Sequence, residues 1–370
     1  MRIAIDARGI NWYRGTGIGT YTENLVRNLI NIYNKDYFRL YWSEQNYDDF
    51  NKENTELLIT SKKHPRFFEQ SYFCNDLNKN KMDIYHVPQN GIGLDVNIKC
   101  KKIITVHDLI PYIMPETVGR GYLLKFLKEM PNIIQNVHGI ITVSEYSKKD
   151  ILKFFPIDPD KIFVTPLAAD SIYKPLDKNM CKSLLKEKYN ITNPFVLYLG
   201  GFSARKNVPS LINSFLKVHS SLNDDYNLVI AGARKDLGEY LNKKYSSLTN
   251  KIKFTGFIPQ EELPIFYNAC DAFVYPSLYE GFGLPPLEAM SCGTPVITSN
   301  TTSIPEVVGN SGLLINPYSE DDISNSLVKL LNDKTLQETL SKRSLKQSAK
   351  FSWQKTAKNT FEIYKKVFES

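Results

Sequence analysis

Short apolar runs of strand length alternate with helical patterns along almost the whole chain, and this alternation restricts the possible folds more than any other feature of the sequence. Six of the runs lie at residues 3–5, 103–106, 139–143, 195–199, 228–231 and 295–298. Helical patterns lie between them, for example at residues 21–33, 208–222 and 319–332. Buried strands separated by helices form parallel sheets with both faces covered, so the sequence predicts an α/β protein.

The length of the chain predicts two domains, because 370 residues exceed what one hydrophobic core usually organises. The segment around Pro175 has the character of a linker, with strand and helix patterns on both sides. We therefore predict two doubly wound domains, residues 1–174 and 175–353, followed by a helix at about 354–370. Open α/β sheets bind ligands at the carboxyl ends of their strands, so a cleft between two such domains would hold the active site.

A modest excess of basic residues limits the classes of partner. The formal net charge is +7 and 42% of the residues are hydrophobic, which fits a soluble globular protein that prefers anionic ligands or anionic lipid surfaces. The sequence contains no dense stripe of Lys and Arg and no known nucleic-acid-binding module, so nucleic acid is not an expected partner.

Three features predict a cytoplasmic protein. The five cysteines are scattered without a close pair, which indicates a reducing compartment. The chain opens directly on the strand-like run 3–5 and lacks the layout of a signal peptide. No apolar run reaches the roughly 18 residues that are needed to span a bilayer.

The segment 280–288, Glu-Gly-Phe-Gly-Leu-Pro-Pro-Leu-Glu, carries the most chemical information. It has Glu280 and Glu288 at its ends, follows the strand-like run 272–276, and leads into a helix that we expect to begin at Leu287. Glycines let the backbone approach a ligand closely, and the N–H groups of a first helical turn attract anions. Ionised glutamates accept hydrogen bonds from hydroxyl groups. The segment therefore predicts a site for an anionic or polyhydroxylated ligand.

Two other loops also follow strands and precede helices. The loop after 195–199 contains Arg205 and Lys206, which are placed to clamp a diphosphate. The alternative is a solvated helix start, but cations there oppose the helix dipole, which favours the functional interpretation. The loop 14–21 contains a G-x-G-x-G pattern around Gly17, which suits phosphate or sugar binding and a tight turn equally well.

His107 follows the strand-like run 103–106, where it could orient a substrate hydroxyl or be a packed residue of the core. The segment Asp158-Pro159-Asp160 has the spacing that some transferases use for a metal, but a polar turn explains it fully. We therefore expect no metal site.

Together these segments resemble the retaining glycosyltransferases of family 4, which have the GT-B fold: two doubly wound, Rossmann-like domains that face each other across a cleft. The resemblance covers nearly the whole chain. Its most specific part is the segment 280–288, whose two glutamates separated by seven residues match the family signature. Arg205 and Lys206 stand where the family keeps its diphosphate-binding pair, and residues 16–19 are similar to its N-terminal glycine loop.

The resemblance implies a nucleotide-sugar site in the C-terminal domain. Glu288 would bind the ribose hydroxyls, and Glu280 would lie beside the donor sugar. Backbone N–H groups at Phe282, Gly283 and Leu284 would support the sugar and the phosphates.

The resemblance also assigns roles outside this segment. Arg205 and Lys206 would neutralise the departing diphosphate, Gly17 would meet the phosphates from the other domain, and His107 would lie near the donor sugar. The last helix would cross back to the N-terminal, acceptor-binding domain. No cofactor is implied, because the nucleotide-sugar donor is a substrate.

The segments Asp6-Ala7-Arg8, 67–70 and 85–88 most resemble the mannosyltransferase-like branch, whose members usually build bacterial surface polysaccharides from GDP-mannose. We predict a retaining, metal-independent hexosyltransferase that moves mannose from GDP-mannose to a glycan or lipid-linked acceptor. One alternative is a UDP-hexose-dependent transferase. Another is a non-catalytic nucleotide-sugar-binding partner, which the presence of both glutamates and both cations argues against.

The segment 122–128 mixes apolar and basic residues, as an interfacial helix would. Peripheral contact with an anionic membrane, at its inner face, is one interpretation. A core-packed helix with exposed lysines is the other.

Overall fold

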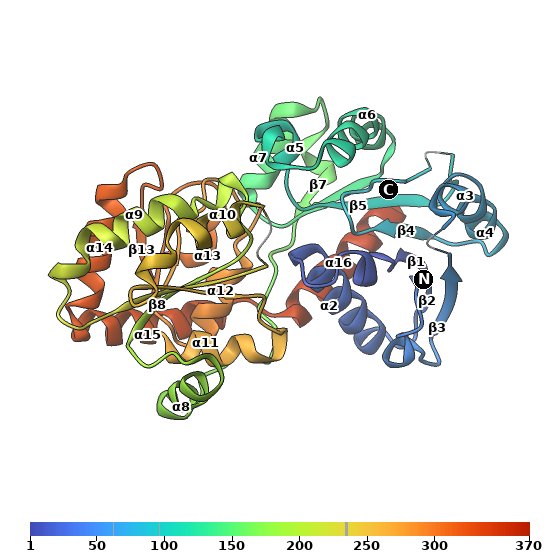
Figure 1. Ribbon diagram of the computed structural model, residues 1–370. Coiled ribbons are helices and arrows are strands. Elements are labelled where there is room, and N and C mark those ends of the chain that lie inside the picture. Colours follow the sequence, from blue (N-terminus) through green and yellow to red (C-terminus); the bar gives the residue numbers. More distant parts are fainter. Residues whose placement is uncertain (62, 96, 234–235) are drawn as a thin grey trace. The chain divides into compact units, whose positions relative to one another are not determined.

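The computed structural model of the protein describes residues 1–61, 63–95, 97–233 and 236–370. The chain divides into two compact units, one of residues 1–167 with 352–370 and one of residues 168–351. Each unit is built on its own parallel sheet flanked by helices (Figure 1), which confirms the prediction of two doubly wound α/β units.

The first unit contains seven parallel strands in the order β3-β2-β1-β4-β5-β6-β7. The strands are β1 (Arg2–Asp6), β2 (Tyr37–Ser43), β3 (Thr55–Thr60), β4 (Ile84–Val87), β5 (Lys101–Val106), β6 (Gly139–Thr142) and β7 (Ile162–Val164). The helices are α1 (Gly9–Trp12), α2 (Gly17–Ile32), α3 (Pro65–Phe67), α4 (Phe73–Lys79), α5 (Ile110–Ile113), α6 (Arg120–Asn136), α7 (Glu145–Phe154) and α16 (Trp353–Glu369). The strand order reverses between β1 and β4, so their carboxyl ends form a topological switch point, where sheets of this kind bind ligands.

The second unit contains six parallel strands in the order β10-β9-β8-β11-β12-β13. The strands are β8 (Phe195–Leu199), β9 (Asn227–Ala231), β10 (Ile252–Gly256), β11 (Ala272–Tyr275), β12 (Val296–Ser299) and β13 (Leu313–Ile315). The helices are α8 (Lys178–Tyr189), η5 (Ala204–Lys206, a 3-10 helix), α9 (Val208–Val218), α10 (Asp236–Lys244), α11 (Leu263–Ala269), α12 (Leu284–Ser291), α13 (Ile304–Val308), α14 (Glu320–Leu331) and α15 (Lys334–Ser348). Here the order reverses between β8 and β11.

Helix α16 belongs to the first unit although it follows the second in the chain. Its Phe361 stacks on Tyr33 of the first unit with ring centroids 3.5 Å apart. Its Tyr364 hydroxyl shares a hydrogen bond of 2.6 Å with Nδ1 of His86 in β4. The helix thus completes the core of the first unit.

The division between the units falls at 167/168, whereas the sequence led us to expect it at 174/175. The reason is the packing of Tyr173, which is buried in the core of the second unit. Its ring meets that of Tyr267 edge to face, with centroids 5.7 Å apart. The segment before Pro175 is therefore part of the second unit and not a free linker.

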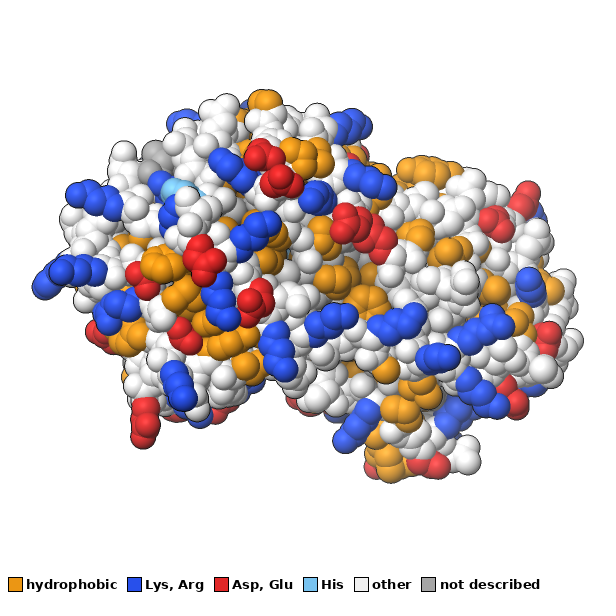
Figure 2. Space-filling view, turned by 180° about the vertical axis from the view of Figure 1, so that it is seen from behind, with side chains coloured by type: hydrophobic (Ala, Val, Ile, Leu, Met, Phe, Trp, Pro, Cys, Tyr) orange, Lys and Arg blue, Asp and Glu red, His pale blue; other side chains and the backbone are white. Residues whose placement is uncertain are grey.

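Figure 2 shows basic side chains spread across both units on one face of the molecule, with acidic and hydrophobic side chains between them. Among the helices of the described residues, none is both long enough and apolar enough to cross a membrane.

Candidate active site

The two loops that carry the predicted diphosphate site leave the second sheet at its switch point. One loop follows β8 and contains Arg205 and Lys206, and the other follows β11 and contains Glu280. Because β8 and β11 are hydrogen-bonded neighbours and parallel, both loops emerge at the same edge of the sheet.

Main-chain contacts fasten these two loops to each other. The carbonyl of Arg205 accepts hydrogen bonds from the Leu278 N–H at 2.7 Å and from the Ser277 hydroxyl at 3.1 Å. Asn207 ends the 3-10 helix η5 in the left-handed conformation, with φ of 57°, and so turns the chain into α9. The backbone therefore fixes the origin of both cationic side chains.

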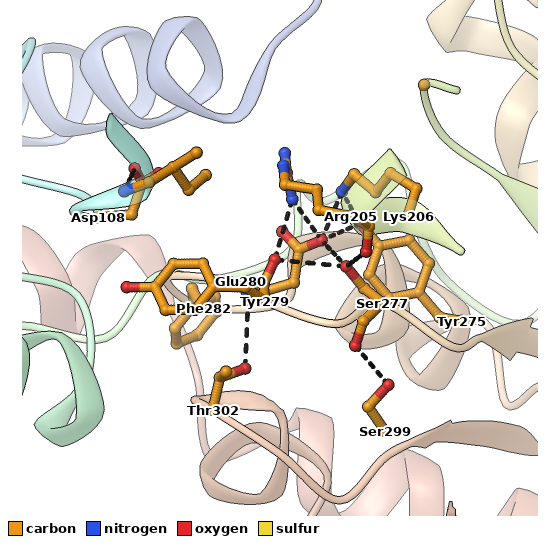
Figure 3. Close-up of polar contacts among 12 residues, drawn as sticks. Asp108, Arg205, Lys206, Tyr275, Ser277, Tyr279, Glu280, Phe282, Ser299 and Thr302 are labelled. Carbon is orange, nitrogen blue, oxygen red and sulfur yellow. Dashed lines mark hydrogen bonds and ion pairs between the residues drawn. The ribbon is translucent and has the colours of Figure 1, made fainter. Parts of the chain in front are cut away.

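Both cations converge on one oxygen of Glu280 (Figure 3). Its Oε1 accepts from Nζ of Lys206 at 2.6 Å and from Nη1 of Arg205 at 2.8 Å. It also accepts from the hydroxyls of Ser277 at 2.6 Å and Tyr275 at 3.1 Å. Four donors, three from the loops and Tyr275 from the end of β11, thus hold this carboxylate in one place.

The charges in this cluster favour an anionic ligand. Burial alone would raise the pKa of Glu280, but the positive charges of Arg205 and Lys206 and the hydrogen bonds to its carboxylate lower it to about 2. Glu280 is therefore ionised at neutral pH. One negative and two positive charges leave the cluster with a charge of +1, which suits a phosphate-bearing ligand.

The loop between Glu280 and α12 requires a glycine at residue 283. Gly283 has φ of 121°, and a Cβ added there would lie 2.7 Å from Cδ1 of Ile304. The carbonyl of Phe282 accepts a hydrogen bond of 2.8 Å from Ser303, and the Phe282 ring packs on Phe351. The backbone of this loop is consequently well fixed.

Helix α12 begins at Leu284 and not at Leu287, where the sequence led us to expect it. The two prolines 285 and 286 occupy the first turn, which accommodates proline because its N–H groups have no partner within the helix. Since prolines have no N–H, the donors at this helix start are limited to Leu284 and the loop before it. The predicted backbone site at Phe282, Gly283 and Leu284 coincides with this stretch.

Glu288 lies further along α12, apart from the cationic pair. The Tyr267 hydroxyl donates to its Oε2 at 2.9 Å. Burial raises the pKa of Glu288 to about 7, although hydrogen bonding from Tyr267 and Tyr173 acts in the opposite direction. This carboxyl group therefore gains and loses its proton near neutral pH.

In the first unit, the three glycines of the segment 15–19, where the loop after β1 leads into α2, have different roles. Gly15 has φ of 76°, and a Cβ on buried Gly19 would lie 2.2 Å from the Tyr13 carbonyl oxygen. Gly17 is exposed and is the first residue of α2, with Thr16 as its N-cap. The turn thus explains Gly15 and Gly19, while Gly17 lies at a helix start facing solvent.

His107 follows β5 and is buried. Its Nε2 lies 2.8 Å from the Pro88 carbonyl oxygen, and its ring meets Tyr21 edge to face. Burial lowers the pKa of His107 to about 4, although the hydrogen bond to the Pro88 carbonyl acts in the opposite direction. The imidazole is therefore neutral at pH 7.

The acidic pair near residue 160 forms a turn. The Asp158 side chain accepts a hydrogen bond of 2.9 Å from the Asp160 N–H. Across the described parts of the chain, no group of three or more His, Cys, Asp or Glu side chains is arranged to hold a metal ion.

The sequence did not identify four residues of the second unit that form hydrogen bonds with Glu280 or Glu288. Tyr275 is the last residue of β11 and Ser277 follows the strand, so their position at a strand end was the available signal. Tyr267 and Ser303 meet the site from α11 and from the loop before α13, and no local pattern marks them.

Family models match most of the chain in two parts. The model described as Glycosyltransferase Family 4 matches residues 15–171, and that described as Glycosyl transferases group 1 matches residues 182–347. O-antigen chain mannosyltransferase B of Escherichia coli is 31% identical over 95% of this chain and 97% of its own length. Serotype-specific mannosyltransferase WbdA of Escherichia coli is 32% identical over 74% of this chain, a match that spans 34% of WbdA.

Solved structures with the same architecture include sucrose-phosphate synthase from Thermosynechococcus elongatus, with a TM-score of 0.76 at 20% identity over 99% of both chains. Anabaena Alr3699/HepE in complex with UDP and glucose has a TM-score of 0.76 at 16% identity, over 97% of this chain and 98% of that chain. These similarities confirm the predicted GT-B fold.

Proposed function

The chain belongs to glycosyltransferase family 4, and from this premise we propose that it is a retaining, metal-independent mannosyltransferase that uses GDP-mannose. Its acceptor in this proposal is a glycan or lipid-linked sugar in the synthesis of a cell-surface polysaccharide. Its similarity to O-antigen chain mannosyltransferase B of Escherichia coli supports this choice. The observation that carries the proposal is the pair Arg205 and Lys206, held on Glu280 at the switch point of the second sheet.

The cationic pair would stabilise the leaving diphosphate. When the bond between C1 of the sugar and the phosphate oxygen breaks, negative charge accumulates on the diphosphate. Arg205 and Lys206 are fixed by Glu280 before the ligand arrives, so no reorganisation is needed at that moment. One such pre-positioned donor lowers the barrier by about 3 kcal/mol in comparable sites. Together the two positive charges match that of a divalent metal ion, which supports metal independence.

Glu280 is poorly suited to act as a nucleophile, which supports front-face attack. Its Oε1 already accepts four hydrogen bonds, two of them from cations, and these lower the reactivity of the carboxylate. In the proposed step the acceptor hydroxyl forms the new bond to C1 on the face from which the diphosphate leaves. The diphosphate takes the bonding electron pair and the proton of the hydroxyl.

Three other residues would bind the donor. Glu288 would accept hydrogen bonds from the ribose hydroxyls, with Tyr267 holding its carboxyl group. Gly17 of the first unit would meet the phosphates at the start of α2, where free N–H groups attract anions. His107, neutral at pH 7, would accept or donate a hydrogen bond to the donor sugar.

Helix α6 supports a peripheral membrane contact. Leu124 is 59% exposed and Leu127 is 38% exposed, and the exposed Lys125 and Lys128 lie beside them. Exposed leucines next to lysines suit the interface of an anionic bilayer. We expect the double variant Leu124→Ser with Leu127→Ser to sediment less with anionic vesicles, and Leu184→Ser, exposed on α8, to sediment like the unaltered protein. Equal sedimentation of all three proteins would remove this part of the proposal.

Donor-dependent nucleotide release tests the proposed activity. The purified protein is incubated with GDP-mannose, UDP-glucose, UDP-galactose, UDP-N-acetylglucosamine or ADP-glucose, with and without a membrane-lipid extract and with and without EDTA. We expect release from GDP-mannose, stimulation by the lipid extract, and strong loss of release in Lys206→Ala. NMR of the product should show the same anomeric configuration as the donor.

Other outcomes would change the proposal in defined ways. Release from a UDP-sugar alone would favour the UDP-hexose alternative. Loss of activity with EDTA would contradict metal independence, and a covalent glycosyl adduct on Glu280 during turnover would contradict front-face attack. If no donor is cleaved but a nucleotide raises the Tm, the chain would be a non-catalytic nucleotide-sugar-binding partner.

A further inference from the structure

The loop after β4 surrounds His107 at the switch point of the first sheet. β4 and β5 are parallel neighbours, so the segment 88–90 and His107 leave the sheet at the same edge. The Pro88 carbonyl oxygen lies 2.8 Å from Nε2 of the imidazole. Two residues later, Oδ1 of Asn90 accepts a hydrogen bond of 2.9 Å from the His107 N–H. The same short loop thus contacts both the ring and the backbone of His107.

Asn90 is held in an uncommon conformation to make this contact. It is 4% exposed and has φ of 56°, in the left-handed region. Its N–H donates to the Thr105 carbonyl at 2.9 Å, and its Nδ2 donates to the Tyr122 hydroxyl at 3.0 Å. The side chain therefore uses both its acceptor and its donor, and it joins β5 to helix α6.

The contact with Pro88 determines which ring nitrogen of His107 carries the proton. A carbonyl oxygen can only accept, so Nε2 must be the protonated nitrogen in this hydrogen bond. In a neutral imidazole the other nitrogen, Nδ1, is then an acceptor. Burial keeps the ring neutral, since it lowers the pKa of His107 to about 4.

We propose that Asn90 is a positioning residue for His107: it fixes the backbone of His107 so that the ring keeps its bond to Pro88 and presents Nδ1 as an acceptor for a hydroxyl of the substrate sugar. The part that concerns the sugar rests on the proposed function. The part that concerns the ring does not, because it follows from contacts within the first unit.

Tyr122 links this arrangement to helix α6. Its hydroxyl accepts a hydrogen bond from the Asn90 amide, and two turns further along α6 Glu129 accepts a hydrogen bond of 3.2 Å from the Gly93 N–H. The helix is therefore attached at two points to the segment that follows β4. Removing the Tyr122 hydroxyl should loosen the Asn90 side chain. The effect on the position of the His107 ring should therefore be smaller than when the Asn90 side chain itself is removed.

The left-handed backbone at residue 90 provides a clean substitution. Glycine tolerates φ of 56°, so Asn90→Gly removes the side-chain contacts without straining the backbone. Asn90→Asp keeps the acceptor for the His107 N–H and is the conservative variant. Tyr122→Phe removes only the hydroxyl. Asn190→Gly, at another left-handed asparagine with φ of 52° in the second unit, is the matched control.

Histidine ring NMR on the full chain gives the readout that is independent of catalysis. The chain has five histidines, and His107→Gln identifies the signal of interest. We expect the unaltered protein to show a protonated Nε2 and an unprotonated Nδ1. In Asn90→Gly we expect the His107 signal to be an average of the two tautomers, and in Tyr122→Phe we expect partial averaging. In Asn90→Asp we expect the signal of the unaltered protein. An unchanged His107 signal in Asn90→Gly would overturn the positioning role.

Kinetics of nucleotide release then test the link to the sugar. Loss of a positioned acceptor should lower kcat about 10- to 100-fold in Asn90→Gly while the KM for the donor stays within about 3-fold. A changed NMR signal with unchanged kcat would overturn the sugar contact and leave the positioning of the ring intact. If the unaltered protein cleaves no donor, the proposed function fails, and the NMR result still decides whether Asn90 positions His107.

Discussion

Replacing Glu288 with glutamine is expected to stabilise the second unit at alkaline pH while it weakens donor binding. Burial raises the pKa of Glu288 from 4.5 to about 7. Between these values the unfolded chain has released this proton and the folded state still holds it, so the stability of the fold falls as the pH rises. The loss is complete above pH 7. At about 1.4 kcal/mol per pH unit, it amounts to about 3 kcal/mol.

Glutamine has the same shape as glutamate but never ionises, so Glu288→Gln should remove this loss. Its carbonyl oxygen can still accept from the Tyr267 hydroxyl, which donates to Glu288 at 2.9 Å. The variant should therefore gain about 3 kcal/mol at pH 8 and less than about 1 kcal/mol at pH 5. It should also bind the nucleotide more weakly, because a neutral amide is a weaker acceptor for the ribose hydroxyls than a carboxylate.

Urea unfolding at both pH values is the assay. The three tryptophans, Trp12, Trp42 and Trp353, all lie in the first unit. Their fluorescence therefore monitors unfolding of the unit that lacks the substitution, and it serves as the internal reference. Hydrogen exchange in α12 monitors the second unit directly. Glu187→Gln, at an exposed position of α8, makes the same change of charge and should have little effect. Equal stabilisation by Glu288→Gln at pH 5 and pH 8, or destabilisation at pH 8, would refute the reasoning.

Three other substitutions test separate parts of the structure. Lys206→Ala should lower kcat about 100-fold with little change in donor KM, because the charge of Lys206 matters most as the bond to the diphosphate breaks. Single-turnover kinetics would measure this loss. An unchanged kcat would exclude the leaving-group role. Gly283→Ala should cost about 1–3 kcal/mol of stability in urea unfolding, whereas Gly201→Ala, where an added Cβ meets nothing within 4 Å, should cost much less. Arg8 is 1% exposed and pairs with Asp6 at 2.6 Å, so Arg8→Met should cost about 3–5 kcal/mol; a loss below 1 kcal/mol in the first unit would show that the pair is not needed.

The sequence allowed the two parallel sheets to be predicted because buried parallel strands appear as short continuous apolar runs. The run 195–199 coincides with β8, and the run 228–231 lies within β9. The segment 280–288 was recognised because its glycines and glutamates lie close together in the chain. The helix start at Leu284 was missed because prolines break helices everywhere except in the first turn.

Other parts of the site depend on contacts between distant segments. The pKa of Glu288 is set by burial and by Tyr267 and Tyr173, which come from α11 and from the start of the second unit. No local pattern connects these tyrosines to α12. The strand order that makes β8 and β11 neighbours is likewise a property of the assembled sheet. Neither the pKa of Glu288 nor the strand order could therefore be predicted from the sequence.

The return of α16 to the first unit has a consequence for synthesis on the ribosome. Domains usually fold in the order in which they are made. Here the first unit emerges as residues 1–167 but lacks the helix that supplies Phe361 and Tyr364 to its core. At about 5–20 residues per second, the 202 residues from 168 to the end of α16 take roughly 10–40 s to translate. During that interval the second unit can complete its fold while the first keeps an apolar face uncovered, so the first unit is the part that would need a chaperone.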